Sequence, residues 1–171
     1  GLPGFPIPGS RSQELPLQRW KEIIDDVEAS FPVMPFFHFS GGEPFLYPGL
    51  MDLIEYAKGK GFSTSVITNG WTLSAIAEDL VSLGVNRINV SIDGPEAIHD
   101  LVRRKMGSFR RAVEGLRAVR EAREKAGKKH PRLTINCTVT PQNFAYMNDI
   151  VKVRDEARAD ALTVEHLIFL D

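Results

Sequence analysis

The sequence predicts an α/β fold in which parallel strands form a partial (β/α) barrel. Strand-like and helix-like segments alternate along the chain, and this order requires parallel strands joined by right-handed crossovers. One strand, 87–93, is apolar on one face only, because Ile88 and Val90 alternate with Asn89 and Ser91. A strand of a doubly wound sheet is apolar on both faces, so a polar face favours a barrel lined by a binding site. The strands are too few to close such a barrel, which is therefore expected to be partial.

The helices are predicted from apolar residues spaced three and four apart and from residues that start or stop a helix. Pro16 suits the first turn of the first helix, and Ser108 is expected to cap the long fourth helix. That helix is expected to turn Arg117, Arg120 and Arg123 outward, opposite its apolar side. The helices are expected over 15–30, from Leu50 to Ala57, from Ser74 to Leu83, from Ser108 through Val119, and over 144–158.

The strands are predicted from short runs of β-branched and aromatic residues that end at turn residues. A second strand with a polar face is 132–140, where Leu133 and Ile135 oppose Asn136 and Thr138. The strands are expected over 35–40, 64–68, 87–93, 132–140 and 161–169.

Length and composition exclude several classes of protein. The 171 residues suit one domain, and 43% hydrophobic residues are enough for an ordinary core. A net charge of -1 excludes a strongly basic nucleic-acid-binding domain, and a single cysteine excludes a disulfide framework. No apolar stretch is long enough to cross a membrane and no leader opens the chain, so a cytoplasmic location is expected, without a membrane or nucleic-acid partner. Residues 1–14, rich in proline and glycine, are expected to form an arm before a core over 15–171.

Small, polar and acidic residues follow the predicted strands. Ligands bind at the carboxyl ends of the strands in folds of this class. Gly41 and Gly42 let the backbone approach a ligand closely, Glu43 offers a carboxylate to an ammonium or a hydroxyl, and Asp93 can accept sugar hydroxyls. Each motif alone is ordinary turn chemistry. Their recurrence at successive strand ends indicates a binding rim.

The motifs at these strand ends resemble those of the radical S-adenosylmethionine (SAM) enzymes. They are His38-Phe-Ser-Gly-Gly-Glu-Pro44, Val66-Ile-Thr-Asn-Gly70 and Asn89-Val-Ser-Ile-Asp-Gly-Pro95. The resemblance runs from about Leu15 to Phe169 and implies a TIM-like partial barrel, of which this chain has about strands two to six and lacks the first. It also implies SAM and a [4Fe–4S] cluster as cofactors, with an electron donor such as flavodoxin or ferredoxin. Reductive cleavage of SAM would give a 5′-deoxyadenosyl radical that abstracts hydrogen from a substrate.

The resemblance further implies a role for each matching residue. Gly41, Gly42 and Glu43 match the motif that binds the methionyl amino group, while Arg103 matches a carboxylate-binding arginine. Ser91 and Asp93 match polar positions near the methionyl carboxylate and the ribose. The full set of expected SAM contacts is Gly41, Gly42, Glu43, Pro44, Thr68, Asn69, Ser91, Asp93, Arg103, Asn136 and Thr138, the last two near the adenosyl group.

The sequence departs from this family at the cluster. Family members carry a Cys-x3-Cys-x2-Cys loop before the helix that corresponds to 15–30, and this chain has only Cys137, which is expected to be a buried core residue. The chain alone is therefore expected to be inactive. Two explanations stay open: the chain begins downstream of the cysteine loop, as its start at Gly1 suggests, or it is a cluster-free barrel that binds SAM, a peptide or a partner. A third and weaker alternative is an unrelated phosphate-binding α/β domain.

Other polar residues receive plainer interpretations. His99 is expected to be exposed in a loop or at a helix start. Apart from Arg103, the nearby basic residues are expected to form a solvated helix start; they are Arg104, Lys105, Arg110 and Arg111. Either Glu165 or His166 should face the lumen of the barrel. A partial barrel leaves a wide lateral opening, which suits a peptide or another large substrate. Members of the family that the chain resembles also act on small molecules, so the substrate is expected to be a peptide or a small molecule.

Overall fold

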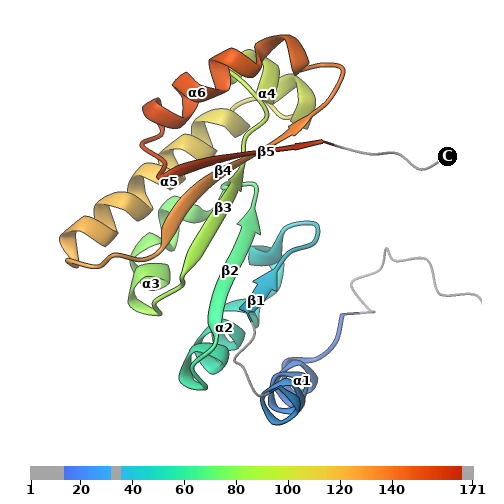
Figure 1. Ribbon diagram of the computed structural model, residues 1–171, viewed down its shortest axis with the longest axis vertical. Helices are drawn as coiled ribbons and strands as arrows, with labels where there is room; N and C mark the ends of the chain where they lie inside the picture. Colours follow the sequence, from blue (N-terminus) through green and yellow to red (C-terminus); the bar gives the residue numbers. More distant parts are fainter. Residues whose placement is uncertain (1–13, 32–35, 167–171) are drawn as a thin grey trace, which may run out of the picture.

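A single parallel sheet organises the chain. The computed structural model describes residues 14–31 and 36–166 (Figure 1). The sheet order is β1-β2-β3-β4-β5, and every neighbouring pair is parallel. The strands are β1 Phe36–Phe39, β2 Ser63–Thr68, β3 Arg87–Ser91, β4 Arg132–Val139 and β5 Ala161–His166. The predicted α/β class is confirmed, and among the described residues β1 and β5 do not pair with each other, so the barrel is open.

Helices connect the strands as the sequence predicts. They are α1 Leu17–Ser30, α2 Leu50–Gly59, α3 Ala77–Ser82, α4 Glu96–Arg103, α5 Ser108–Lys125 and α6 Met147–Glu156, with short 3-10 helices η2 Pro44–Leu46, η3 Leu73–Ala75 and η4 Phe144–Tyr146. The segments predicted to be helical from Ser74 and from residue 144 begin as 3-10 turns, and α4 was not predicted. The arm expected over 1–14 lies outside the described residues except for Glu14, as does the predicted end of the last strand.

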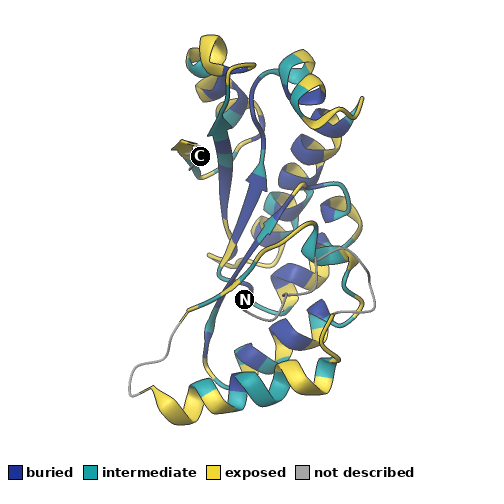
Figure 2. Cartoon of the chain, turned by 90° about the vertical axis from the view of Figure 1, so that its right-hand side faces the viewer, coloured by how far each residue is buried: buried dark blue, intermediate teal, exposed yellow. Residues whose placement is uncertain are grey.

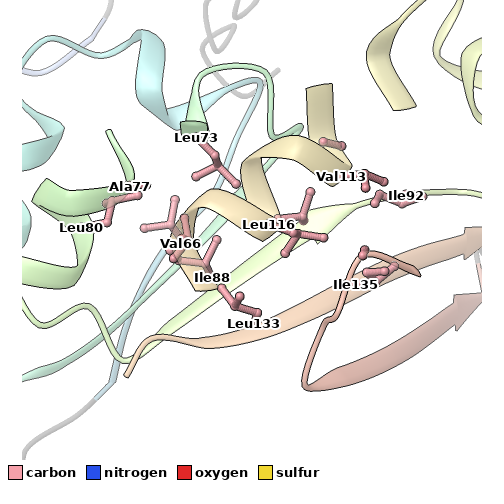
Figure 3. Close-up of a cluster of buried hydrophobic side chains, with 14 of the residues drawn as sticks. Val66, Leu73, Ala77, Leu80, Ile88, Ile92, Val113, Leu116, Leu133 and Ile135 are labelled. Atoms are coloured by element: carbon pink, nitrogen blue, oxygen red, sulfur yellow. The ribbon is translucent and has the colours of Figure 1, made fainter. Parts of the chain in front are cut away.

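One face of the sheet packs against the helices. Ile88, Val90 and Ile135 are fully buried there, together with Leu116 from α5 and Leu80 from α3. Figure 3 shows the aliphatic side chains of this cluster meeting between strands and helices, and in Figure 2 buried residues run along the strands and the neighbouring sides of the helices. The alternation predicted for 87–93 and 132–140 is therefore confirmed.

The opposite face of the sheet carries polar side chains that bond across the strands. Asn89 Nδ2 donates to Ser65 Oγ at 3.0 Å, and His38 Nδ1 lies 3.1 Å from the same hydroxyl. Asn136 Nδ2 lies 3.4 Å from Glu165 Oε1, so of Glu165 and His166 it is Glu165 that lies on this face. The polar face spans the sheet from β1 to β5.

The structure corrects two predictions for α5. Gly107, with φ +79°, precedes the helix, and the Ser108 hydroxyl does not cap it but donates to Asp100 Oδ1 at 2.8 Å. Arg123 is not on the outer face: its Nη1 donates to Asp160 Oδ2 at 2.6 Å and to the Pro131 carbonyl at 2.7 Å. The long arginine side chain thus ties the end of α5 to the segments that begin β4 and β5.

Candidate functional site

The Glu43 carboxylate joins the carboxyl ends of β1 and β2. Its Oε1 accepts the Thr68 hydroxyl at 2.8 Å and its Oε2 accepts the Asn69 N–H at 2.8 Å. Oε1 also accepts the Phe45 N–H at 3.3 Å, where Pro44 begins η2. These bonds fix the direction of the carboxylate before any ligand is present. The structure brings together Glu43, Thr68 and Asn69, as their shared position at strand ends predicted.

The backbone beside Glu43 is open. Gly41 has φ +143°, a conformation that side chains rarely adopt, and a Cβ built at Gly41 or Gly42 would meet no atom within 4 Å. This empty space lets the peptide N–H and C=O groups meet a bound molecule directly. Gly41, Gly42, Glu43 and Pro44 also line a cavity of about 910 Å³, which extends between α1, β1 and α2 and includes neither Ser91 nor Asp93. Since Asp93 and Arg103 do not line this cavity, we place the site on the strand ends, with the loop from Gly41 to Pro44 shared between the site and the cavity.

Asp93 and Arg103 form the second group of the site. Arg103 Nε donates to Asp93 Oδ2 at 2.6 Å, and the Thr138 N–H donates to Oδ1 at 3.3 Å. The Asp93 side chain is only 2% exposed, whereas that of Arg103 is 36% exposed. The two terminal NH2 groups of Arg103 make no hydrogen bond to the described part of the chain. Arg103, rather than Asp93, is therefore the group that faces solvent.

Two residues that the sequence analysis did not assign to the site bind the backbone N–H and carbonyl of Asp93. The Asp93 N–H donates to His99 Nδ1 at 3.1 Å, and Asn143 Nδ2 donates to the Asp93 carbonyl at 2.8 Å. Asn143 Nδ2 also donates to the Thr138 carbonyl at 2.8 Å, which links the ends of β3 and β4. His99 is 1% exposed and Asn143 is fully buried, so the expectation that His99 is exposed was wrong.

The remaining expected contacts lie between these two groups. Ser91 is the register partner of Asn136, and both are partly buried. The expected set thus separates into Glu43 with Thr68 and Asn69, Asp93 with Arg103 and Thr138, and the Ser91–Asn136 pair on adjacent strands. All of them lie at or near the carboxyl ends of β1 to β4, where folds of this class bind ligands.

The described residues offer SAM a suitable set of groups but offer an iron–sulfur cluster none. SAM has an ammonium and a carboxylate, which match a fixed carboxylate, an open backbone and a half-exposed guanidinium. Cys137, the one cysteine of the sequence, is fully buried, and burial, reinforced by the nearby Asp93, raises the pKa of its thiol to about 11. No group of three histidine, cysteine or acidic residues in the described ranges could hold a metal ion.

Across residues 14–31 and 36–166, the structure has no helix with the length and hydropathy that a membrane span requires.

Comparison with known proteins gives relatives of several activities. An AdoMet-dependent heme synthase from Oleidesulfovibrio alaskensis is 34% identical over 160 residues, which cover 91% of this chain and 37% of the synthase. A PqqA peptide cyclase from Bradyrhizobium diazoefficiens is 28% identical over 165 residues, which cover 95% of this chain and 41% of the cyclase. The chain thus spans about two fifths of the length of these relatives.

Solved structures share the fold. Streptococcus suis SuiB bound to S-adenosylmethionine superposes with a TM-score of 0.70 at 18% identity, over 91% of this chain and 35% of SuiB. SuiB has also been solved with its precursor peptide SuiA. The family model of the Radical SAM superfamily matches residues 4–153. This chain therefore belongs to the radical SAM superfamily, whose members use SAM and a [4Fe–4S] cluster.

Proposed function

We propose that this chain is the SAM-binding core of a radical SAM enzyme. The observation that carries the proposal is the pairing of two oriented, opposite charges on one rim: the Glu43 carboxylate, fixed from β2, and the Arg103 guanidinium, anchored on Asp93. An amino acid group such as the methionyl part of SAM has the complementary pair of charges. Neither a phosphate ester nor an apolar ligand would use both groups.

Each residue has a distinct role in this proposal. Glu43 accepts hydrogen bonds from the ammonium of SAM, and the open peptide groups of Gly41 and Gly42 meet the methionyl chain. The free NH2 groups of Arg103 form two parallel bonds to the carboxylate. Ser91 and Asn136 offer polar contacts to the nucleoside from the polar face. These residues would hold and orient SAM, which with a reduced cluster, whose ligands are not among them, would supply a radical for abstraction of hydrogen from the substrate.

A peptide is the substrate class that we propose, with a flavodoxin or ferredoxin as electron donor. The PqqA peptide cyclase relative and the SuiB complex with a precursor peptide support a peptide. The open side of the sheet between β1 and β5 suits an extended chain. Because another relative is a heme synthase, a small molecule should be tested as a substrate alongside the peptide.

The test is SAM affinity in the native gene product after anaerobic loading with iron and sulfide. We expect Glu43→Ala and Arg103→Ala each to weaken SAM binding about 10- to 100-fold, because each removes hydrogen bonds between charged groups. Glu121→Ala, at an exposed position of α5, is the matched control and should bind as the unchanged protein does. Asp93→Ala is unsuited to this test because its carboxylate is buried and supports the fold. Unchanged affinity in both site variants would refute the site.

One observation favours a second function, that of a binding module without turnover: the single cysteine is buried and not available to a cluster. Formation of 5′-deoxyadenosine under reducing conditions distinguishes the two functions. The enzyme forms it, whereas the module binds SAM and releases it unchanged.

A further inference from the structure

The hydrogen bond and the packing of His99 define its tautomer and the direction of its ring. Its Nδ1 accepts the Asp93 N–H at 3.1 Å, so Nδ1 must carry a lone pair and the proton of the neutral ring must be on Nε2. The ring is 1% exposed and lies edge-on to Phe109, with 6.1 Å between ring centroids. A buried ring with this contact has little freedom to rotate, so its lone pair is held in one direction.

The backbone around Asp93 is fixed on both sides. His99 holds its N–H, and Asn143 holds its carbonyl while also binding Thr138. With both peptide groups held and Oδ1 on the Thr138 N–H, the carboxylate can present Oδ2 in one direction only, toward Arg103. Neither His99 nor Asn143 has an exposed surface that a ligand could touch.

The hydrogen bond at Nε orders the Arg103 side chain before a ligand binds. An arginine side chain has many rotamers, and a ligand that binds a free one must order it. Here Nε is already bound to Asp93, and the terminal NH2 groups remain available at a side chain that is 36% exposed. Displacement of Asp93 would release the guanidinium into solvent.

We propose that His99 is a positioning residue, which orients Asp93 and through it holds Arg103 ready for the anionic group of the ligand. The inference rests on the proposed function for the identity of that ligand, SAM. It assigns to Asp93 the support of Arg103 in place of direct contact with a sugar. His99 thus holds Asp93 through its N–H, and Asp93 in turn holds Arg103 through its carboxylate.

Two amide substitutions separate positioning from a general structural role. His99→Asn places a carbonyl oxygen where Nδ1 lies, whereas His99→Gln places one near Nε2, away from the Asp93 N–H. In the native gene product we expect His99→Asn to bind SAM within about threefold of the unchanged protein and His99→Gln to bind about tenfold more weakly. Equal affinities for the two variants would overturn the proposal.

Combination with Arg103→Ala sharpens the test. If His99 acts through Arg103, His99→Gln has no further effect on SAM affinity once Arg103 is replaced, because the guanidinium that His99 would position is then absent. An effect of the same size in both backgrounds would mean that His99 supports the fold only.

A ligand-free measurement keeps this inference separable from the proposed function. The Arg103 Nε–H signal in nuclear magnetic resonance spectra should exchange slowly with water in the unchanged protein and in His99→Asn, and rapidly in His99→Gln. This pattern with no SAM binding by the unchanged protein would refute the proposed function and leave the positioning role standing. Slow exchange in all three proteins would refute the positioning role.

Discussion

At the scale of single residues, His99 and Asp100 are buried neighbours that differ in charge: the histidine is neutral and the aspartate is ionised. Burial lowers the pKa of His99 to about 4; Asp93 and Asp100 oppose this shift, and Arg103 adds to it. Burial alone would raise the pKa of Asp100, but hydrogen bonds from the N–H groups of Phe109 and Gly107 and from the Ser108 hydroxyl outweigh it, and the pKa lies below its usual value. Near neutral pH the histidine is therefore neutral and the aspartate is charged.

The histidine makes folding stability depend on pH. The unfolded chain binds a proton at His99 below a pH of about 6.5, whereas the folded protein does so only near pH 4. Between these values the unfolded state binds more protons, so the stability contributed by the neutral ring falls as the pH falls. We expect the free energy of unfolding in urea to fall less steeply in His99→Asn than in the unchanged protein over this range. Parallel curves for the two proteins would contradict the buried neutral ring.

The same residues show where prediction from the sequence fails. The spacing of Ile88 and Val90 correctly predicted which side of β3 packs in the hydrophobic core, whereas Asn89 on the other side is buried among polar groups. In α4 the relation is reversed: His99 and Asp100 are buried while Leu101 is 62% exposed. A search for apolar periodicity cannot find a helix whose buried side is polar, so α4 and the support of Asp93 were missed.

At the scale of elements, the approach of η3 to α5 depends on glycine. A Cβ at Gly115 of α5 would lie 2.6 Å from Leu73 Cβ and 3.0 Å from the Gly70 carbonyl oxygen. Gly70 itself, with φ +81°, would place a Cβ 2.8 Å from the Cα of Ala112. This close packing fixes the turn after β2, and with it the Asn69 N–H that holds Glu43.

Replacement of this glycine should cost stability. We expect Gly115→Ala to lower the free energy of unfolding by about 1–3 kcal/mol, because η3 must move away from α5. Gly59→Ala is the matched control at the end of α2, where an added Cβ meets no atom within 4 Å; it should be neutral or slightly stabilising. Urea unfolding of both variants measures the difference, and a Gly115→Ala variant as stable as Gly59→Ala would contradict the packing.

The strands β2, β3 and β4 were predicted more closely than the starts of α3 and α6, whereas the starts of α2 and α5 were predicted correctly. β-branched runs between turn residues define β2, β3 and β4 locally, and their bounds agree with the predicted segments to within two residues. The start of α3 depends instead on how η3 packs on α5, which is a contact between distant segments. Arg123 was misplaced for the same reason, because its partner Asp160 lies 37 residues further along the chain.

At the scale of the whole molecule, the centre of the sheet is its most fully paired and buried part. β3 pairs on both sides and its Ile88 and Val90 are fully buried, whereas β1 and β5 each pair on one side within the described residues. We expect amide hydrogen exchange to be slowest in β3 and fastest in β1 and β5, because local opening begins where fewest contacts hold the backbone. Mass spectrometry of the exchanged peptides measures this order, and a β5 as protected as β3 would contradict it.

The sheet order, which follows the order of the strands in the chain, has a consequence for biosynthesis. Each strand from β2 to β5 pairs with the strand that precedes it in the chain, so it can dock on a partner that has already left the ribosome. We expect the proposed site to form in the same direction, because the partners of Glu43 are synthesised first, those of Asp93 in α4 next, and Asn143, which joins β3 to β4, last. A nascent chain that ends before Asn143 would contain the Glu43 contacts but lack the bond from Asn143 to the Asp93 carbonyl, so we expect the proposed binding rim to be complete only late in translation.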